Sequence, residues 1–102
     1  MRYVVQPTPR TTADLNGIYD SLSEYSEPAA ERTCDLIKDG IRGLADFPRR
    51  YAIARESAGS SVEIRQLIVG NYRVLYQIVM GQVMVMRIVH ASQETLRPMD
   101  LM

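Results

Sequence analysis

The sequence contains one cysteine, one lysine and no tryptophan, and these scarcities narrow the kinds of site it can form. Cys34 has no partner for an internal disulfide and no second cysteine for a cysteine-based metal site. No apolar run approaches the roughly 18 residues that a membrane-spanning helix needs, and the apolar N-terminal stretch is too short for a signal peptide. We therefore predict a cytoplasmic protein with no metal or other cofactor.

No Walker loop, dinucleotide fingerprint, HExxH or nucleophile elbow is present, although this excludes little in so short a chain. A chain of 102 residues supports one domain with one modest core. We expect that single domain over residues 1–102, with a core of about residues 2–93. Residues 94–102 have no clear period, which predicts a partly mobile tail.

The net charge is zero, but the charges are unevenly placed. Residues 1–47 hold eight acids and five bases, whereas residues 48–102 hold four acids and seven arginines. Arginine suits bidentate contacts with carboxylates and phosphates better than lysine does. The C-terminal half is thus expected to meet an acidic group, although small proteins also acquire such a split by chance.

The first half predicts a short strand followed by an antiparallel helical hairpin. Tyr3-Val4-Val5 reads as the strand, Thr11-Thr12-Ala13-Asp14 as a capping-box helix start, and Asp46-Phe47-Pro48 as the end of the hairpin. Two apolar stripes at helical spacing lie between them, separated by Ser26-Glu27-Pro28. They are Leu15, Ile18, Tyr19, Leu22 and Tyr25, then Ala30, Cys34, Ile37, Ile41 and Leu44.

The second half predicts a three-stranded antiparallel meander over about residues 62–69, 72–80 and 83–91. Gly70-Asn71 and Gly81-Gln82 fit two-residue hairpin turns, since Gly and Asn supply positive φ angles. The fold class is therefore α+β, with all strands in one twisted sheet and the two-helix hairpin packed against it. The helical hairpin can cover only one face of so small a sheet.

The turns also predict which residues lie opposite one another. If Val69 opposes Tyr72 and Met80 opposes Val83, one face carries Arg65, Tyr76 and Arg87 in a row, and the other carries Arg73 opposite His90. Both faces are otherwise apolar. We therefore expect one face to remain exposed, which predicts a protein partner or a homodimer.

These residues are the candidate site, and each has a functional and a structural interpretation. Arg73 and His90 can orient a phosphate and transfer a proton, or they can simply bond to backbone carbonyls and acids. Arg65, Tyr76 and Arg87 can form a cation–π ladder, or a docking row for a carboxylate-rich peptide.

Several of these segments together resemble the RelE/ParE superfamily, the toxins of bacterial type II toxin–antitoxin systems. The resemblance rests on Leu44 to Pro48, Ile64-Arg65, Gly70 to Tyr76 and a final strand that ends at His90, and it covers about residues 2–93. It implies an α+β fold. It also implies a ParD- or RelB-like antitoxin whose C-terminal segment wraps the toxin in a hetero-oligomeric complex.

RelE-like members cleave mRNA on the ribosome with a metal-free basic site, and Arg73 stands where their central Tyr-Arg arginine stands. The remainder of that pattern is missing: the second strand has no lysine, Gln93 lies near where an arginine is expected, and no tyrosine follows Tyr76. A chain with zero net charge is also a poor fit to an RNA-bound enzyme, because positively charged side chains that contact phosphates raise the affinity for RNA.

ParE-like members, which poison DNA gyrase by binding, are more similar in the hairpin, its Phe-Pro end, Ile64-Arg65 and His90. The resemblance therefore favours a ParE-like toxin that is not an enzyme, with five binding residues: Arg65, Arg73, Tyr76, Arg87 and His90. One alternative is a ribosome-dependent mRNA endonuclease with Arg73 and His90 as catalytic residues. Another is a non-toxic remnant that only binds its antitoxin for autoregulation.

Overall fold

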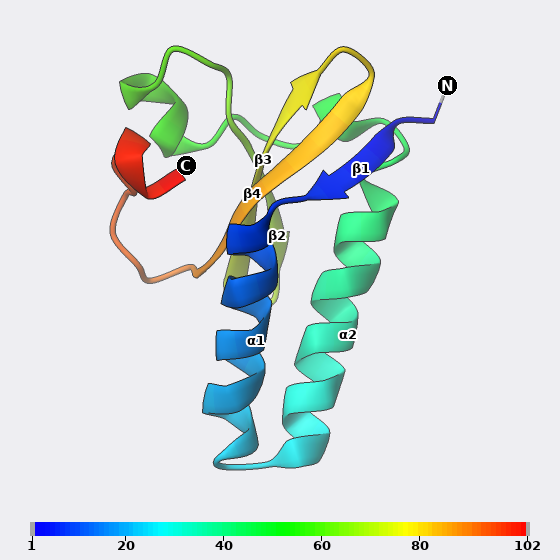
Figure 1. The fold of residues 1–102 in the computed structure, drawn as a ribbon, viewed down its shortest axis with the longest axis vertical. Helices are drawn as coiled ribbons and strands as arrows, with labels where there is room; N and C mark the ends of the chain where they lie inside the picture. Colours follow the sequence, from blue (N-terminus) through cyan, green and yellow to red (C-terminus); the bar gives the residue numbers. More distant parts are fainter. Residues whose placement is uncertain (1, 102) are drawn as a thin grey trace.

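Two helices lie against one face of a four-stranded sheet in the computed structural model, which describes residues 2–101 (Figure 1). The strand order is β1-β4-β3-β2; β1 runs parallel to β4, and the other neighbours are antiparallel. The predicted α+β class is confirmed. The elements are β1 (Val4–Pro7), α1 (Pro9–Ser23), α2 (Glu27–Gly43), η1 (Pro48–Arg50), η2 (Arg55–Gly59), β2 (Arg65–Val69), β3 (Tyr72–Val79), β4 (Gln82–His90) and η3 (Pro98–Leu101).

The helix α1 begins earlier than the capping-box signal predicts. Thr8 is the N-cap, because its Oγ1 accepts a hydrogen bond from the Thr11 amide at 3.3 Å, and Pro9 takes the first helical position. Thr11 is instead buried and donates to the Val85 carbonyl at 2.8 Å, which ties α1 to β4. The break before α2 is confirmed, with Ser26 as the N-cap.

The main core lies between the helices and the sheet. Its buried members come from α2, the segment after it and the three C-terminal strands: Ile37, Leu44, Leu67, Val74, Tyr76, Val83, Val85 and Ile88. Gly40 lets α2 approach β2 closely, since a Cβ there would lie 3.0 Å from Leu67 Cδ2 and 3.1 Å from Val69 Cγ2. No helix among the described residues is long and apolar enough to cross a membrane.

The predicted register is confirmed for β2 and β3 but is wrong for β3 and β4. Val69 pairs with Tyr72 across Gly70-Asn71, as expected. The second turn, however, is Met80-Gly81, whose φ angles of 50° and 78° are both positive, as a type I′ turn requires. A β-bulge between Leu75 and Tyr76 then shifts the pairing again.

Two predicted pairs are lost through this change. Tyr76 pairs with Val85 rather than Arg87, and Arg73 pairs with Val89 rather than His90. Arg87 is therefore absent from the row that Arg65 and Tyr76 form.

The second face of the sheet is covered, so the prediction of an exposed apolar face is wrong. A second buried cluster lies there: Ala54, Ile64, Leu75, Val89, Leu96 and Leu101. The last two residues belong to the segment predicted as a partly mobile tail. Residues 94–101 instead pack over the sheet, and we call them the C-terminal strap.

Candidate functional site

Arg73 is the central candidate, and its guanidinium is sealed inside the protein. The residue is 2% exposed. Its Nη1 and Nη2 donate to Glu56 Oε1 and Oε2 at 2.9 and 2.7 Å, and Nη1 also donates to Gln66 Oε1 at 3.1 Å. The bidentate geometry is the strongest form of this ion pair. Buried in this way, Arg73 presents no N–H group to a phosphate or a protein partner.

Glu56 completes this buried pair and joins it to the C-terminal strap. The residue is 2% exposed, and its Oε2 also accepts a hydrogen bond from the Leu96 amide at 3.2 Å. Burial alone would raise the pKa of Glu56. The hydrogen bonds from Arg73 and Leu96, with the Arg73 charge, outweigh burial and lower the pKa from 4.5 to about 2.

This lowered pKa predicts a loss of stability in acid. Because the folded-state pKa lies below the unfolded-state value, the stabilisation by Glu56 is fully present above pH 4.5 and is lost as the pH falls to about 2. The loss should be roughly 3 kcal/mol. Urea unfolding across pH 2–5 checks it, with Glu56→Gln as the comparison, because glutamine does not titrate. Equal pH slopes for the two proteins would contradict the assignment.

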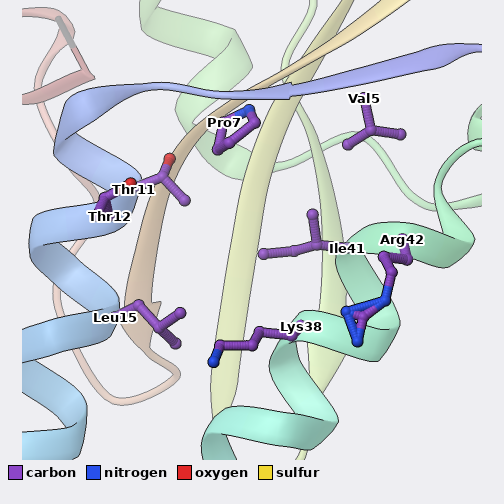
Figure 2. Close-up of a pocket in the computed structure, with 8 residues that line it drawn as sticks. All are labelled: Val5, Pro7, Thr11, Thr12, Leu15, Lys38, Ile41 and Arg42. Atoms are coloured by element: carbon purple, nitrogen blue, oxygen red, sulfur yellow. The ribbon is translucent and has the colours of Figure 1, made fainter.

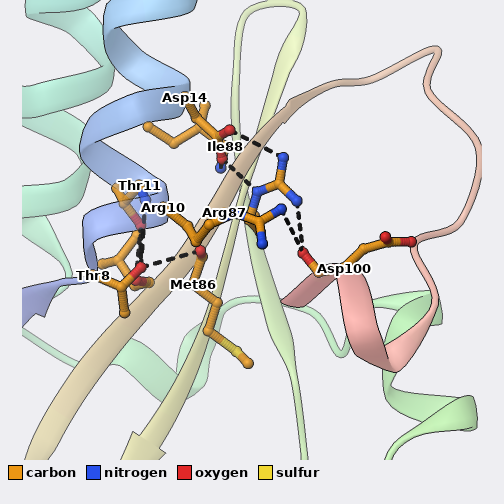
Figure 3. A network of polar contacts seen from close by, with 9 residues as sticks. Thr8, Arg10, Thr11, Asp14, Met86, Arg87, Ile88 and Asp100 are labelled. Carbon is orange, nitrogen blue, oxygen red and sulfur yellow. Dashed lines mark hydrogen bonds and ion pairs between the residues drawn. The ribbon is translucent and has the colours of Figure 1, made fainter. Parts of the chain in front are cut away.

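Arg87 is bound by α1 and by the strap (Figure 3). Its Nε and Nη2 donate to Asp14 Oδ2 and Oδ1 at 2.6 and 3.0 Å, and its Nη1 donates to the Asp100 carbonyl at 2.6 Å. The bonds to Asp14 raise the pKa of Arg87. Asp14 Oδ2 also accepts from the Ile88 amide at 2.9 Å, so this carboxylate joins α1 to β4.

Arg65 and Tyr76 hold the segment that follows α2. Arg65 Nη1 donates to the carbonyls of Arg49 and Tyr51 at 2.9 and 2.6 Å, and Arg65 Nη2 lies 3.0 Å from Glu63 Oε1. Tyr76 is fully buried and its hydroxyl donates to the Pro48 carbonyl at 2.6 Å. Burial raises the pKa of Tyr76 to about 12. Both side chains thus anchor one loop.

His90 is the exposed member of the predicted site. Its Nδ1 accepts a hydrogen bond from the Ser92 amide at 3.1 Å, so the proton of the neutral ring lies on Nε2. The ring packs edge-on against Tyr72, with the centroids 5.4 Å apart. Tyr72 pairs with His90 while Arg73 pairs with Val89, so strand alternation places Arg73 and His90 on opposite faces of the sheet.

The predicted residues therefore do not converge on one cavity, and their acidic partners Glu56 and Asp14 were not among the predicted site residues. A buried arginine requires a counter-ion or hydrogen-bond acceptor, but nothing in the sequence marks which of the twelve acids supplies it. Among residues 2–101, no group of three His, Cys, Asp or Glu side chains is placed to hold a metal ion.

A hollow of the surface lies elsewhere, between β1 and the two helices (Figure 2). It has a volume of about 300 Å³ and is mainly apolar. Lys38 extends along it toward Leu15. The lining residues are Val5, Pro7, Thr11, Thr12, Leu15, Lys38, Ile41 and Arg42, and we call this hollow the β1 groove.

Comparison with known proteins identifies the class to which this fold belongs. The profile of the ParE toxin of the type II toxin–antitoxin system parDE matches residues 5–95. A curated relative, Toxin RelE2 of Caulobacter vibrioides, is 32% identical over 85 residues, which is 82% of this chain and 90% of the relative.

Solved structures show the same fold at lower identity. The chromosomal ParDE toxin–antitoxin system from P. aeruginosa matches with a TM-score of 0.75 and 17% identity, over 89% of this chain and 98% of that one. The RelBE2 toxin–antitoxin complex from Mycobacterium tuberculosis matches with a TM-score of 0.58 and 22% identity, over 91% and 95%.

The fold and these matches define a small toxin of the RelE/ParE superfamily, as the sequence resemblance implied. More narrowly, the chain belongs to the ParE toxin family of type II toxin–antitoxin systems.

Proposed function

We propose that this toxin inhibits DNA gyrase by binding, as ParE-like toxins do, and is neutralised by direct binding of a cognate antitoxin. The observation that carries the choice is the sealed Arg73–Glu56 pair. A metal-free ribonuclease must place charged groups at the scissile phosphate, whereas Arg73 and Arg87 are both neutralised by internal carboxylates. A toxin that acts by binding requires no such accessible group.

The β1 groove is the surface that we assign to the antitoxin. Val4 and Thr8 donate their amides to the carbonyls of Gly81 and Val85, so alternation directs the backbone groups of Val5 outward along an open sheet edge. An extended or helical segment can lie along this edge, with an apolar side chain in the groove and a carboxylate at Lys38. The P. aeruginosa and M. tuberculosis matches are toxin–antitoxin systems, which supports such a partner.

One observation favours a second candidate, the RelE-like mRNA endonuclease. The curated relative at 32% identity is named Toxin RelE2, and the exposure of His90 is compatible with a catalytic role. In this alternative Arg73 becomes available only if Glu56 and the strap withdraw from it. The third possibility, a non-toxic remnant that binds the antitoxin, predicts normal growth when the protein is expressed alone.

A supercoiling assay with purified gyrase tests the proposal. We expect the toxin to inhibit supercoiling at concentrations that leave an in vitro translation reaction intact, because its action depends on binding gyrase. Pulse labelling after induction should then show DNA synthesis falling before protein synthesis. Intact supercoiling with cleavage of mRNA at the ribosomal A site would overturn the proposal in favour of the endonuclease.

The same assay tests the antitoxin surface, since added antitoxin should restore supercoiling. Lys38→Glu should weaken this rescue on the order of tenfold, because it opposes the partner carboxylate. Arg32→Glu is the matched control, as Arg32 lies exposed on the same helix outside the groove. Equal rescue of both variants would exclude the β1 groove as the antitoxin surface.

A further inference from the structure

One end of the molecule carries an exposed aromatic ring on an unusual backbone. Phe47 is 74% exposed. Its backbone has a φ of 50°, a left-handed conformation that residues other than glycine rarely adopt. Its neighbours Leu44 and Pro48 are buried, and the Pro48 carbonyl is held by Tyr76. The fold thus fixes the strained backbone while leaving the ring in solvent, where it contributes little to the core.

Two arginines beside Phe47 are oriented but not neutralised. Arg49 donates to the Tyr3 hydroxyl at 2.6 Å with its Cζ 5.9 Å from the ring centroid. Arg50 donates to the Tyr51 hydroxyl at 2.8 Å with its Cζ 4.9 Å from that ring. Within residues 2–101 neither forms an ion pair with a carboxylate. Both guanidinium groups are therefore positioned by tyrosine side chains, and neither positive charge is neutralised by a carboxylate of this protein's described residues.

These side chains surround a hollow of the surface. The hollow, of about 390 Å³, is lined by Tyr3, Phe47, Pro48, Arg49 and Arg50. The hollow lies at the end of the molecule where the start of β1 lies beside the β3–β4 turn, because the Val4 amide donates to the Gly81 carbonyl (Figure 1). We call these five lining residues the Phe47 surface.

We propose that the Phe47 surface binds an acidic segment of the toxin's protein target, with an apolar side chain of that segment in the hollow. Exposed Phe, Tyr and Arg side chains are the types enriched in protein interfaces, and Tyr and Arg dominate their binding energy. The unpaired charges of Arg49 and Arg50 select carboxylates. The lining of the hollow is mainly apolar and would add little to phosphate binding, so a protein fits this surface better than a nucleic acid.

This inference rests on the proposed function, in which the toxin acts by binding a protein. It deepens that proposal by assigning to the target a binding surface on the toxin that is separate from the antitoxin surface. The Phe47 surface shares no residue with the β1 groove assigned to the antitoxin.

Phe47→Gly separates the binding role from a structural one. Glycine tolerates the positive φ, so the melting temperature should stay within a few degrees of the wild-type value or rise. Gyrase inhibition and growth arrest should weaken at least on the order of tenfold, while antitoxin affinity stays unchanged. Arg49→Ala with Arg50→Ala should give the same pattern, because Arg65 contacts only the Arg49 backbone. The matched controls are Leu36→Ala and Arg32→Ala, both exposed on α2.

The other outcomes are equally informative. Undiminished growth arrest in both variants would overturn the inference. A parallel loss of antitoxin binding would also overturn it, because the Phe47 surface would then be a binding site for the antitoxin. Binding of a single-stranded DNA oligonucleotide by wild type but not by the variants would also overturn it. If wild type arrests growth without inhibiting gyrase, and the variants do not arrest growth, the gyrase proposal fails while the binding surface is supported.

Discussion

Replacing Glu56 with alanine is expected to destabilise the protein by about 3–5 kcal/mol, because it leaves the Arg73 charge buried without a counter-ion. Domains of this size have total stabilities of about 5–15 kcal/mol, so much of the chain should unfold under mild denaturant. Urea unfolding at pH 7, with the midpoint and slope analysed together, measures the loss.

Two comparisons make this result specific to a buried pair. Glu56→Leu combined with Arg73→Met removes both charges and should recover most of the stability. Asp39→Ala breaks the exposed Asp39–Arg42 pair on α2 and should cost at most about 1 kcal/mol. A cost for Glu56→Ala no larger than that of Asp39→Ala would show that the Arg73–Glu56 pair does not lie in the interior.

Removing the C-terminal strap together with Met102 is expected to cost about 3–6 kcal/mol, since Leu96 and Leu101 leave the second buried cluster and each contributes about 1.5–3 kcal/mol. The truncation also removes the Leu96 amide from Glu56 and the Asp100 carbonyl from Arg87. The second face of the sheet should then bind the dye ANS. Thermal unfolding and ANS fluorescence of the truncated and full-length chains measure both effects.

Met99→Ala serves as the control within the strap, because Met99 is exposed and its loss should change stability by less than about 0.5 kcal/mol. A truncated chain that melts like the full-length protein and binds no dye would contradict the structural role of the strap. It would instead support the mobile tail that the sequence predicted.

The sequence predicted the elements well where local chemistry determines them. Ser26 before Pro28 predicted the start of α2, and Gly70-Asn71 predicted the turn that sets the β2–β3 register. The second turn could not be predicted in this way, because Met80 adopts a positive φ that methionine rarely takes. The bulge at Leu75 and Tyr76 leaves no mark in the local sequence, yet it changes which residues face Arg87.

Long-range contacts account for most of what the sequence did not predict about the site. Leu96 and Leu101 lie in a segment whose apolar residues follow no clear period, so the sequence did not indicate that they cover the sheet. Glu56 precedes a stretch rich in serine and glycine that reads as a flexible loop, and only the fold brings it to Arg73, 17 residues away in sequence. The sequence did single out Arg73 and Arg87 within apolar strands, but it did not identify Glu56 and Asp14 as the carboxylates that pair with them.

The parallel pairing of β1 with β4 has a consequence for the synthesis of the toxin. The first strand, Val4–Pro7, can join the sheet only after the last strand, Gln82–His90, has emerged from the ribosome. At about 5–20 residues per second, the nascent chain spends several seconds without a complete sheet. The Phe47 surface includes Tyr3, directly before β1, so it too is complete only after β1 has paired with β4. If the proposed function holds, chains that terminate before β4 should not arrest growth, because both the sheet and the Phe47 surface are incomplete in them.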